Sequence, residues 1–263
     1  MNRIDKKFRE LRKKRKKAFI AYITAGDPDL STTQKLIPVL EESGVDILEL
    51  GVPFSDPLAD GATIQRASQR ALTKGATLTK IISLVKTLRQ KVDMPIVPMS
   101  YYNLINAYGI QNFVRDAAGA GCDGIIIPDL PADEAGELTR AAKKYNLAVI
   151  FLAAPTTTNQ RIKLIDKKTR GFLYYVSLTG VTGERKQLPK DLTRDLKRIR
   201  RLVKKPLCVG FGISTPKQVR MIAKYADGVI VGSAIVNAIE KNRHSKGLVK
   251  KTGKFVQRLV SAI

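Results

Sequence analysis

The sequence predicts an α/β protein, a (β/α)8 TIM barrel with an extra N-terminal helix and a C-terminal helical segment. Eight short apolar runs recur along the chain, and amphipathic segments fill the intervals between them. The length of 263 residues is the usual size of one such barrel. Because no linker or low-complexity segment interrupts the chain, we expect residues 1–263 to form a single barrel domain.

The apolar runs predict the strands. Most are rich in Val, Ile or Leu without alternation, which is typical of parallel strands covered by helices on the outside. We expect the strands at Phe19–Thr24, Ile47–Gly51, Ile96–Ser100, Gly124–Pro128, Ala148–Ala153, Phe172–Val176, Leu207–Phe211 and Gly228–Val231.

Apolar residues at helical spacing predict the helices between these strands. Pro38 is expected in the first turn of the helix that it enters, where its missing N–H costs nothing. The basic segment Met1–Lys17 and the end Glu240–Ile263 are expected to be appended helices. The other predicted helices are Thr33–Ser43, Leu78–Val92, Ile110–Ala120, Ala132–Tyr145, Thr158–Lys168, Leu192–Val203 and Pro216–Tyr225.

A doubly wound open sheet is the alternative fold. Such a sheet normally has fewer strands and carries a glycine fingerprint after the first one. The loop after the first predicted strand reads Ala25-Gly26-Asp27-Pro28, which has no such fingerprint. The barrel is therefore the better interpretation.

Composition excludes several classes of protein. No apolar run reaches the roughly 18 residues of a membrane span, and no secretory signal is recognisable. Cys122 and Cys208 have no metal-ligand spacing and are expected to be buried free thiols in a cytoplasmic protein. With His244 as its single histidine, the chain is expected to hold no metal and to use no histidine-centred catalytic triad.

The formal net charge of +24 is unusually high. Ten of the residues from Arg3 to Lys17 are basic, and further basic runs cover Lys186–Lys205 and Lys241–Lys254. These runs are either a polyanion-binding surface or solvated helix faces that favour Lys and Arg. Aromatic residues are sparse among them and no nucleic-acid-binding motif accompanies them, so we expect no specific nucleic-acid partner.

Candidate catalytic groups lie around the end of the second strand. Glu49 ends an apolar run, and the turn-rich loop that follows carries Asp56 and Asp60. A buried carboxylate is costly unless it is paired or functional, and no Lys or Arg occurs between residues 41 and 64. Glu49 could still be a structural acid and Asp60 a turn residue, since Asp-Gly is a common turn dipeptide.

Glycines after the last strands predict a phosphate site. Gly212 follows the seventh strand, and Gly232 with Ser233 follows the eighth. Barrels commonly build phosphate sites from these two loops and a helix N-terminus, although glycines also form ordinary tight turns. The expected ligand is a small phosphorylated molecule.

The carboxylate run resembles the signature of the tryptophan synthase alpha subunit. It reads Glu49-Leu50-Gly51-Val52-Pro53-Phe54-Ser55-Asp56-Pro57-Leu58-Ala59-Asp60-Gly61. The similarity continues in order along the chain at Tyr101–Asn103, Ile127–Pro131, Thr179–Gly183, Gly210–Ser214 and Gly232–Val236. The chain departs from the family pattern at Ala62, at Leu178 and in its high charge.

The resemblance implies a lyase that cleaves indole-3-glycerol phosphate to indole and glyceraldehyde 3-phosphate without a cofactor. It makes Glu49 the general acid, with a raised pKa, and Asp60 the ionised acceptor for the indole N–H on a wetter loop. It makes Asp129 a support for the catalytic groups and leaves Asp56 to the loop or a partner contact. The implied substrate-binding residues are Tyr22, Tyr101, Ile127, Tyr174, Thr182, Gly183, Phe211, Gly212, Gly232 and Ser233.

The resemblance also implies a partner. The family acts with a tryptophan synthase beta subunit in an α2β2 heterotetramer, and pyridoxal phosphate belongs to that partner. Without the resemblance, the residues are compatible with two other functions. One is another phosphate-binding barrel enzyme, and the other is a barrel that acts mainly as an activating subunit or polyanion binder.

Overall fold

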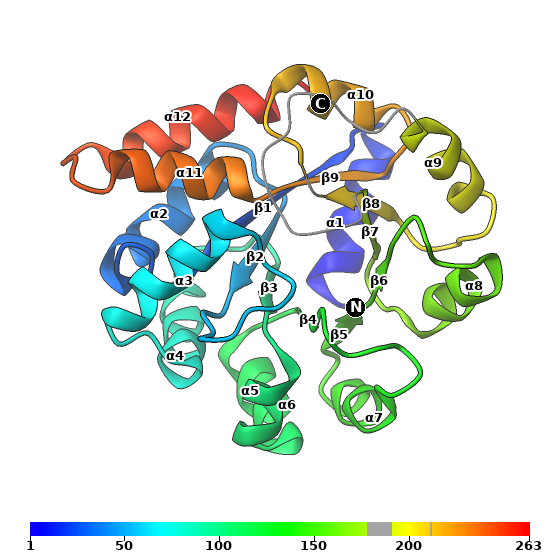
Figure 1. Cartoon of the computed structure of the whole chain (residues 1–263), viewed down its shortest axis with the longest axis horizontal. Coiled ribbons are helices and arrows are strands. Elements are labelled where there is room, and N and C mark those ends of the chain that lie inside the picture. The colour runs from blue at the N-terminus through cyan, green and yellow to red at the C-terminus, as the bar shows by residue number, and fades with distance from the viewer. Residues whose placement is uncertain (178–190, 211) are drawn as a thin grey trace.

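The computed structural model describes residues 1–177, 191–210 and 212–263, and within them parallel strands surround a central axis with helices outside (Figure 1). The hydrogen-bonded order is β5-β4-β3-β2-β1-β9-β8-β7-β6. The strands are β1 Ala18–Thr24, β2 Ile47–Gly51, β3 Ile96–Met99, β4 Gly124–Ile126, β5 Ala148–Ile150, β6 Leu152–Ala153, β7 Leu173–Val176, β8 Leu207–Gly210 and β9 Gly228–Val231.

The barrel closes through one strand that is split in two. β5 pairs with β4, and β6 pairs with β7. Only Phe151 separates β5 from β6, so the two pieces are one strand of the predicted barrel, interrupted at a single residue. The predicted fold class is confirmed, and the run Ala148–Ala153 accounts for the ninth strand.

The helices surround this sheet (Figure 1). They are α1 Arg3–Lys13, α2 Leu30–Glu42, α3 Ala62–Thr73, α4 Leu78–Leu88, α5 Tyr102–Tyr108, α6 Ile110–Ala120, α7 Gly136–Lys144, α8 Asn159–Lys168, α9 Leu192–Arg200, α10 Pro216–Ala223, α11 Ser233–Asn242 and α12 Leu248–Val260.

The prediction for Pro38 was wrong. It lies well inside α2, because that helix begins at Leu30 rather than at Thr33. Asp29 sets the earlier start, since its side chain accepts a hydrogen bond from the Thr32 amide at 2.7 Å. The helix tolerates the interior proline because Leu36, Ile37 and Leu40 are buried, which offsets the lost backbone bond.

Two helices were not predicted, and one began earlier than expected. α3 and α5 were missed because they start directly from loops that carry candidate site residues. The C-terminal helical segment begins at Ser233 rather than at Glu240, since Gly232, directly after β9, serves as N-cap of α11. The last part of the chain then folds back as α12, against α2 and α11.

The N-terminal helix covers the bottom of the barrel. Its buried residues Ile4, Phe8 and Leu11 belong to the same apolar cluster as the side chains inside the barrel. The rings of Phe8 and Phe172 lie 5.9 Å apart. α1 is therefore part of the core, not an appendage, and the opposite end of the barrel is left for the site.

Alternation along the strands decides which side chains face inward. Ile20, Ile47 and Val97 contribute to the inner cluster, and their neighbours pack outward against the helices. Residues two positions later on the same strands again face inward, and they lie near the C-terminal ends of these strands. Tyr22 and Glu49 are such residues, and they are direct partners in the β1–β2 register.

Candidate active site

Glu49 is a buried carboxyl group. Its side chain is 0% exposed, and neither carboxyl oxygen has a hydrogen-bond partner among the residues that the structure describes. Burial raises the pKa of Glu49 from an ordinary value of 4.5 to about 8. The carboxyl group therefore holds its proton at neutral pH and can give it to a bound molecule, as a general acid must.

Asp60 lies in the loop between β2 and α3. Burial raises its pKa to about 6, and a side-chain hydrogen bond from Tyr101 opposes that rise. Asp60 was expected on a wetter loop, yet it is only partly exposed, because Tyr101 covers it. With a pKa of about 6 it is still mostly ionised at neutral pH, so the two carboxyl groups differ in protonation state.

Tyr22 lies close to both carboxyl groups. Burial raises the pKa of the Tyr22 hydroxyl well above its usual range, and the charges of Asp60 and Glu49 both raise it further. Tyr174 experiences the same two charges from the other side of the barrel, with Glu49 the stronger. Both tyrosines therefore lie near the two carboxyl groups, and their contact with an indole ring stays a prediction.

Two glycines make room for these tyrosine rings. A Cβ atom at Gly51 would overlap the Tyr22 hydroxyl, and one at Gly210 would lie 2.6 Å from the Tyr174 hydroxyl. Gly51 ends β2 and Gly210 ends β8, so both rings lie across neighbouring strand ends. The close approach of ring and backbone requires glycine at both places.

Tyr101 and Asp129 have separate roles in the structure. The Tyr101 hydroxyl accepts a hydrogen bond from the Ala59 amide at 3.0 Å, and the Phe54 ring lies 5.2 Å from its own. Tyr101 therefore holds the loop that carries Asp60. Asp129 is exposed, and its side chain accepts a hydrogen bond from the Tyr102 amide at 2.9 Å. It therefore fixes the start of α5. Asp56 is also exposed.

The position of Ile127 differs from the expectation. Ile127 packs in the cluster between the sheet and the helices, and Ile126 packs inside the barrel. The strand alternates, so a shift of one residue exchanges the two faces. Ile126 is the better candidate for contact with a ligand in the barrel.

The glycine loops lie at the end of the barrel where β8 and β9 finish. Gly212 has a φ of +75°, a conformation that favours glycine. Gly232 is the N-cap of α11 and Ser233 its first residue, so backbone N–H groups with no partner inside the helix gather there. Thr182, Gly183 and Phe211, also predicted for the substrate, lie outside the described residues.

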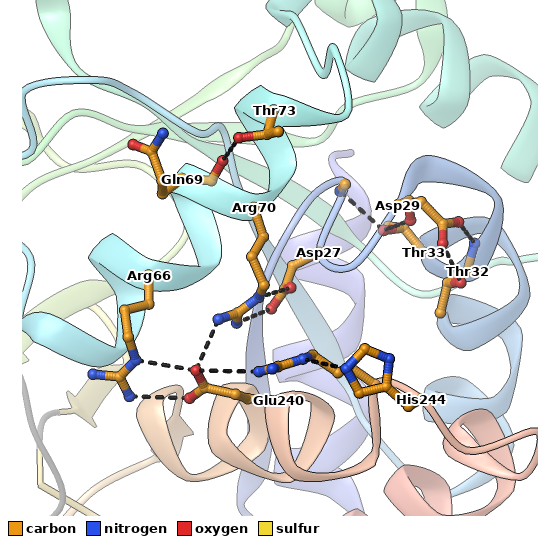
Figure 2. A network of polar contacts seen from close by, with 12 residues as sticks. Asp27, Asp29, Thr32, Thr33, Arg66, Gln69, Arg70, Thr73, Glu240 and His244 are labelled. Carbon is orange, nitrogen blue, oxygen red and sulfur yellow. Dashed lines mark hydrogen bonds and ion pairs between the residues drawn. The ribbon is translucent and has the colours of Figure 1, made fainter.

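A polar network joins three segments beside the site and was not predicted (Figure 2). Arg70 on α3 donates to Asp27 after β1 and to Glu240 on α11. Arg66, one turn earlier on α3, forms two hydrogen bonds of 3.0 Å with Glu240. In the sequence, the polar end of the first strand at Asp27 was visible, but nothing identified its partners.

Cys122 and Cys208 are buried free thiols, as predicted, and burial raises the pKa of Cys122 to about 12. Within the described residues, no group of three or more His, Cys, Asp or Glu side chains could hold a metal ion. In the same residues, no helix is both long and apolar enough to cross a membrane.

A family model described as "Tryptophan synthase alpha chain" matches residues 8–263. The chain belongs to the tryptophan synthase alpha chain family. The alpha chain of Geotalea daltonii is 51% identical over 250 residues, which are 94% of this chain and 95% of the relative. The alpha chain of Geobacter sulfurreducens is 48% identical over 263 residues, which are 100% of this chain and 99% of the relative.

Solved structures agree with the tryptophan synthase alpha fold. The subunit alpha from Legionella pneumophila superposes with a TM-score of 0.94 at 40% identity, covering 100% of this chain and 98% of that one. A chain of the tryptophan synthase complex from Pyrococcus furiosus gives a TM-score of 0.86 at 40% identity, covering 93% and 98%. The chain is thus a lyase of tryptophan biosynthesis that cleaves indole-3-glycerol phosphate to indole and glyceraldehyde 3-phosphate.

Proposed function

We propose that Glu49 and Asp60 perform this cleavage as one protonated and one ionised carboxyl group. The observation that carries the proposal is the Glu49 carboxyl group, which is fully buried and has no hydrogen-bond partner in the described part of the chain. A carboxyl group held in this state is costly to the fold. The cost is understandable if the group is kept free to transfer a proton to the substrate.

In the proposed reaction, Glu49 gives its proton to C3 of the indole ring. Asp60 accepts a hydrogen bond from the indole N–H and stabilises the positive charge that develops on the ring. The bond between C3 and the glycerol carbon C3′ then breaks, and its electron pair returns to the ring. The Glu49 carboxylate takes the proton of the C3′ hydroxyl, so the aldehyde forms and Glu49 is protonated again.

Other residues around the two carboxyl groups are proposed to bind the indole ring and the phosphate of the substrate. Tyr22 and Tyr174, with Ile126, offer apolar surface for the indole ring. The backbone N–H groups around Gly212, Gly232 and Ser233 are proposed to bind the phosphate, and the N-terminus of α11 favours its negative charge. Thr182, Gly183 and Phe211 stay predictions for the same ligand.

We further propose a tryptophan synthase beta subunit as partner in an α2β2 heterotetramer. The similar Pyrococcus furiosus chain comes from a tryptophan synthase complex. The Asp60 loop supports a contact, because its Leu58 side chain is 89% exposed beside the site. In this proposal the alpha reaction needs no cofactor, pyridoxal phosphate belongs to the partner, and the single-domain chain acts in the cytoplasm.

The test of the catalytic proposal is indole release by Glu49→Gln, measured with and without a beta subunit. Release is expected to be slow for the wild-type chain alone and faster with the partner. The variant should lose at least about 1,000-fold in kcat under both conditions, within the usual range for a general acid. It should bind indole-3-propanol phosphate, an unreactive analogue, within about threefold of wild type.

Asp56→Asn is the matched control, because Asp56 is an exposed carboxylate of the same loop region. Assayed without a partner, it should keep wild-type activity. Near wild-type activity in Glu49→Gln would refute the role of Glu49. An equal loss in Asp56→Asn would show that the assay reports on the loop rather than on proton transfer.

A further inference from the structure

A groove with a volume of about 810 Å³ is lined mainly by residues of α11 and α12. These two helices lie side by side on the outside of the barrel (Figure 1). Ser214 and Thr215, in the turn between β8 and α10, also line the groove. Neither of the two carboxyl groups lines the groove; Ser214 and Ala234 lie beside the loops proposed to bind the substrate phosphate. Its volume is in the range of about 300–1,000 Å³ typical of small-molecule sites.

Four cations line this groove. Lys241 comes from α11, and Lys251, Lys254 and Arg258 come from α12. The three residues of α12 are spaced by three and four positions, so they lie on one face of the helix. All four cations therefore line one groove rather than being scattered over the surface.

These cations have no acidic partner. The helices α10, α11 and α12 carry one carboxylate between them, Glu240. Glu240 does not line the groove and is held by Arg66 and Arg70 on the side of α3 (Figure 2). Within the residues that the structure describes, no ion pair joins any of the four cations to a carboxylate; Lys251 contacts the Ser245 hydroxyl at 3.1 Å.

The surfaces between the cations are apolar or neutral. Ala234, Ala238 and Phe255 contribute carbon surface, and the Arg258 guanidinium lies 5.9 Å from the Phe255 ring centre. Asn242 and Gln257 add amide groups. A ligand with a planar organic part and a multiply charged end would match both kinds of surface.

We propose that this groove binds a small organic polyphosphate of the nucleotide class. Its phosphates would lie among Lys241, Lys251, Lys254 and Arg258, and its ring against Phe255. Four cations balance the charge of about three or four that a triphosphate carries at neutral pH. The bounded groove, with one aromatic side chain, suits a single ligand better than an extended RNA backbone, which needs a continuous basic track.

The test is calorimetric titration of the full chain with inorganic tripolyphosphate and, separately, with ATP. A salt concentration of about 150 mM suppresses the attraction between exposed charges that lie more than about 8 Å apart. Saturating indole-3-propanol phosphate is present throughout, so that the substrate site does not take up the probe. We expect one saturable site for each probe, with ATP the tighter of the two because of its ring.

Lys251→Glu combined with Lys254→Glu should weaken both probes at least tenfold. The matched control is Arg140→Glu with Lys163→Glu, exposed cations on α7 and α8 that undergo the same change of charge. The control should stay within twofold of wild type. If the first pair does not fold, Lys251→Gln with Lys254→Gln serves in its place, with an expected loss of at least fourfold.

Three results would overturn the proposal. One is the absence of saturable binding at 1 mM probe. The second is an equal loss of affinity in the two variant pairs, which would indicate general charge attraction only. The third is an ATP affinity no higher than that of tripolyphosphate; conversely, loss of the ATP advantage in Phe255→Leu would support the contact with the ring.

Discussion

Arg70 and Asp27 form a two-point ion pair between α3 and the segment after β1 (Figure 2). The Nε atom lies 2.7 Å from Oδ1, and a terminal nitrogen lies 2.9 Å from Oδ2. The Asp27 side chain is 0% exposed and that of Arg70 is 21% exposed. The same guanidinium also binds Glu240 at 2.8 Å, so one side chain joins three segments that are far apart in the chain.

Arg70→Ala should destabilise the fold by about 3–5 kcal/mol, because it leaves Asp27 buried and unpaired. Arg66→Ala is the control, since Arg66 also pairs with Glu240 but has a side chain that is 52% exposed. It should cost no more than about 1 kcal/mol. Denaturant unfolding of the two variants measures the difference, and a larger loss for Arg66→Ala would contradict the assignment.

Glu49→Gln should stabilise the protein increasingly as pH rises. The folded pKa of about 8 lies above the ordinary value of 4.5, so only unfolded Glu49 ionises between these values. The contribution of Glu49 to the free energy of unfolding should therefore fall across this range, whereas glutamine at position 49 does not titrate and contributes no such change. The free energies of unfolding should be similar near pH 4 and differ by several kcal/mol, on the order of 5, above pH 8.

Thermal or denaturant unfolding of the wild type and Glu49→Gln at several pH values checks this prediction. A difference in stability that does not change with pH would show that Glu49 has the same pKa in the folded and unfolded chain.

The pH profile of kcat/KM should reflect both carboxyl groups. The falling limb is expected near pH 8, where Glu49 loses its proton, and a rising limb near pH 6, where Asp60 ionises. The substrate phosphate also titrates near pH 6, so the limb near 8 is the decisive one. Steady-state indole release across pH 5–9 measures it, and constant activity through pH 9 would argue against proton donation by Glu49.

Gly51→Ala should raise KM for indole-3-glycerol phosphate at least tenfold, because the new methyl group displaces the Tyr22 ring. The control is Gly119→Ala in α6, where an added Cβ meets nothing within 4 Å. That change should leave KM unaltered and stabilise the helix by about 0.5–1 kcal/mol. Steady-state kinetics and unfolding of both variants would test the pair, and an unchanged KM in Gly51→Ala would mean that Tyr22 does not contact substrate.

Much of the barrel was predictable because it depends on local sequence. Apolar runs gave Ile47–Gly51 and Gly228–Val231 with the observed bounds, and a helical period gave Ile110–Ala120. The start of α2 was not predicted, because a capping side chain, Asp29, outweighed the expected effect of Pro38. Capping depends on one hydrogen bond, which hydrophobic periodicity does not report.

The candidate site was predictable only where it depends on local sequence. Glu49 could be identified as a carboxyl group in an apolar strand, and its high pKa follows from that burial. Ile127 was assigned to the ligand by the family resemblance alone; in the structure it packs in the cluster between the sheet and the helices, and Ile126 packs inside the barrel. The partners of Arg70 could not be found, because they lie 43 and 170 residues away in the chain.

The position of α1 has a consequence for the order of folding. Asn2 binds the backbone of Asp123 and Asn146, contacts that span 121 and 144 residues. At a synthesis rate of about 5–20 residues per second, the second contact cannot form until on the order of ten seconds after Asn2 is made. Ile4, Phe8 and Leu11 pack in one cluster with residues as late in the chain as Cys208 and Ile230, so the first helix gains its full set of native contacts only late in synthesis.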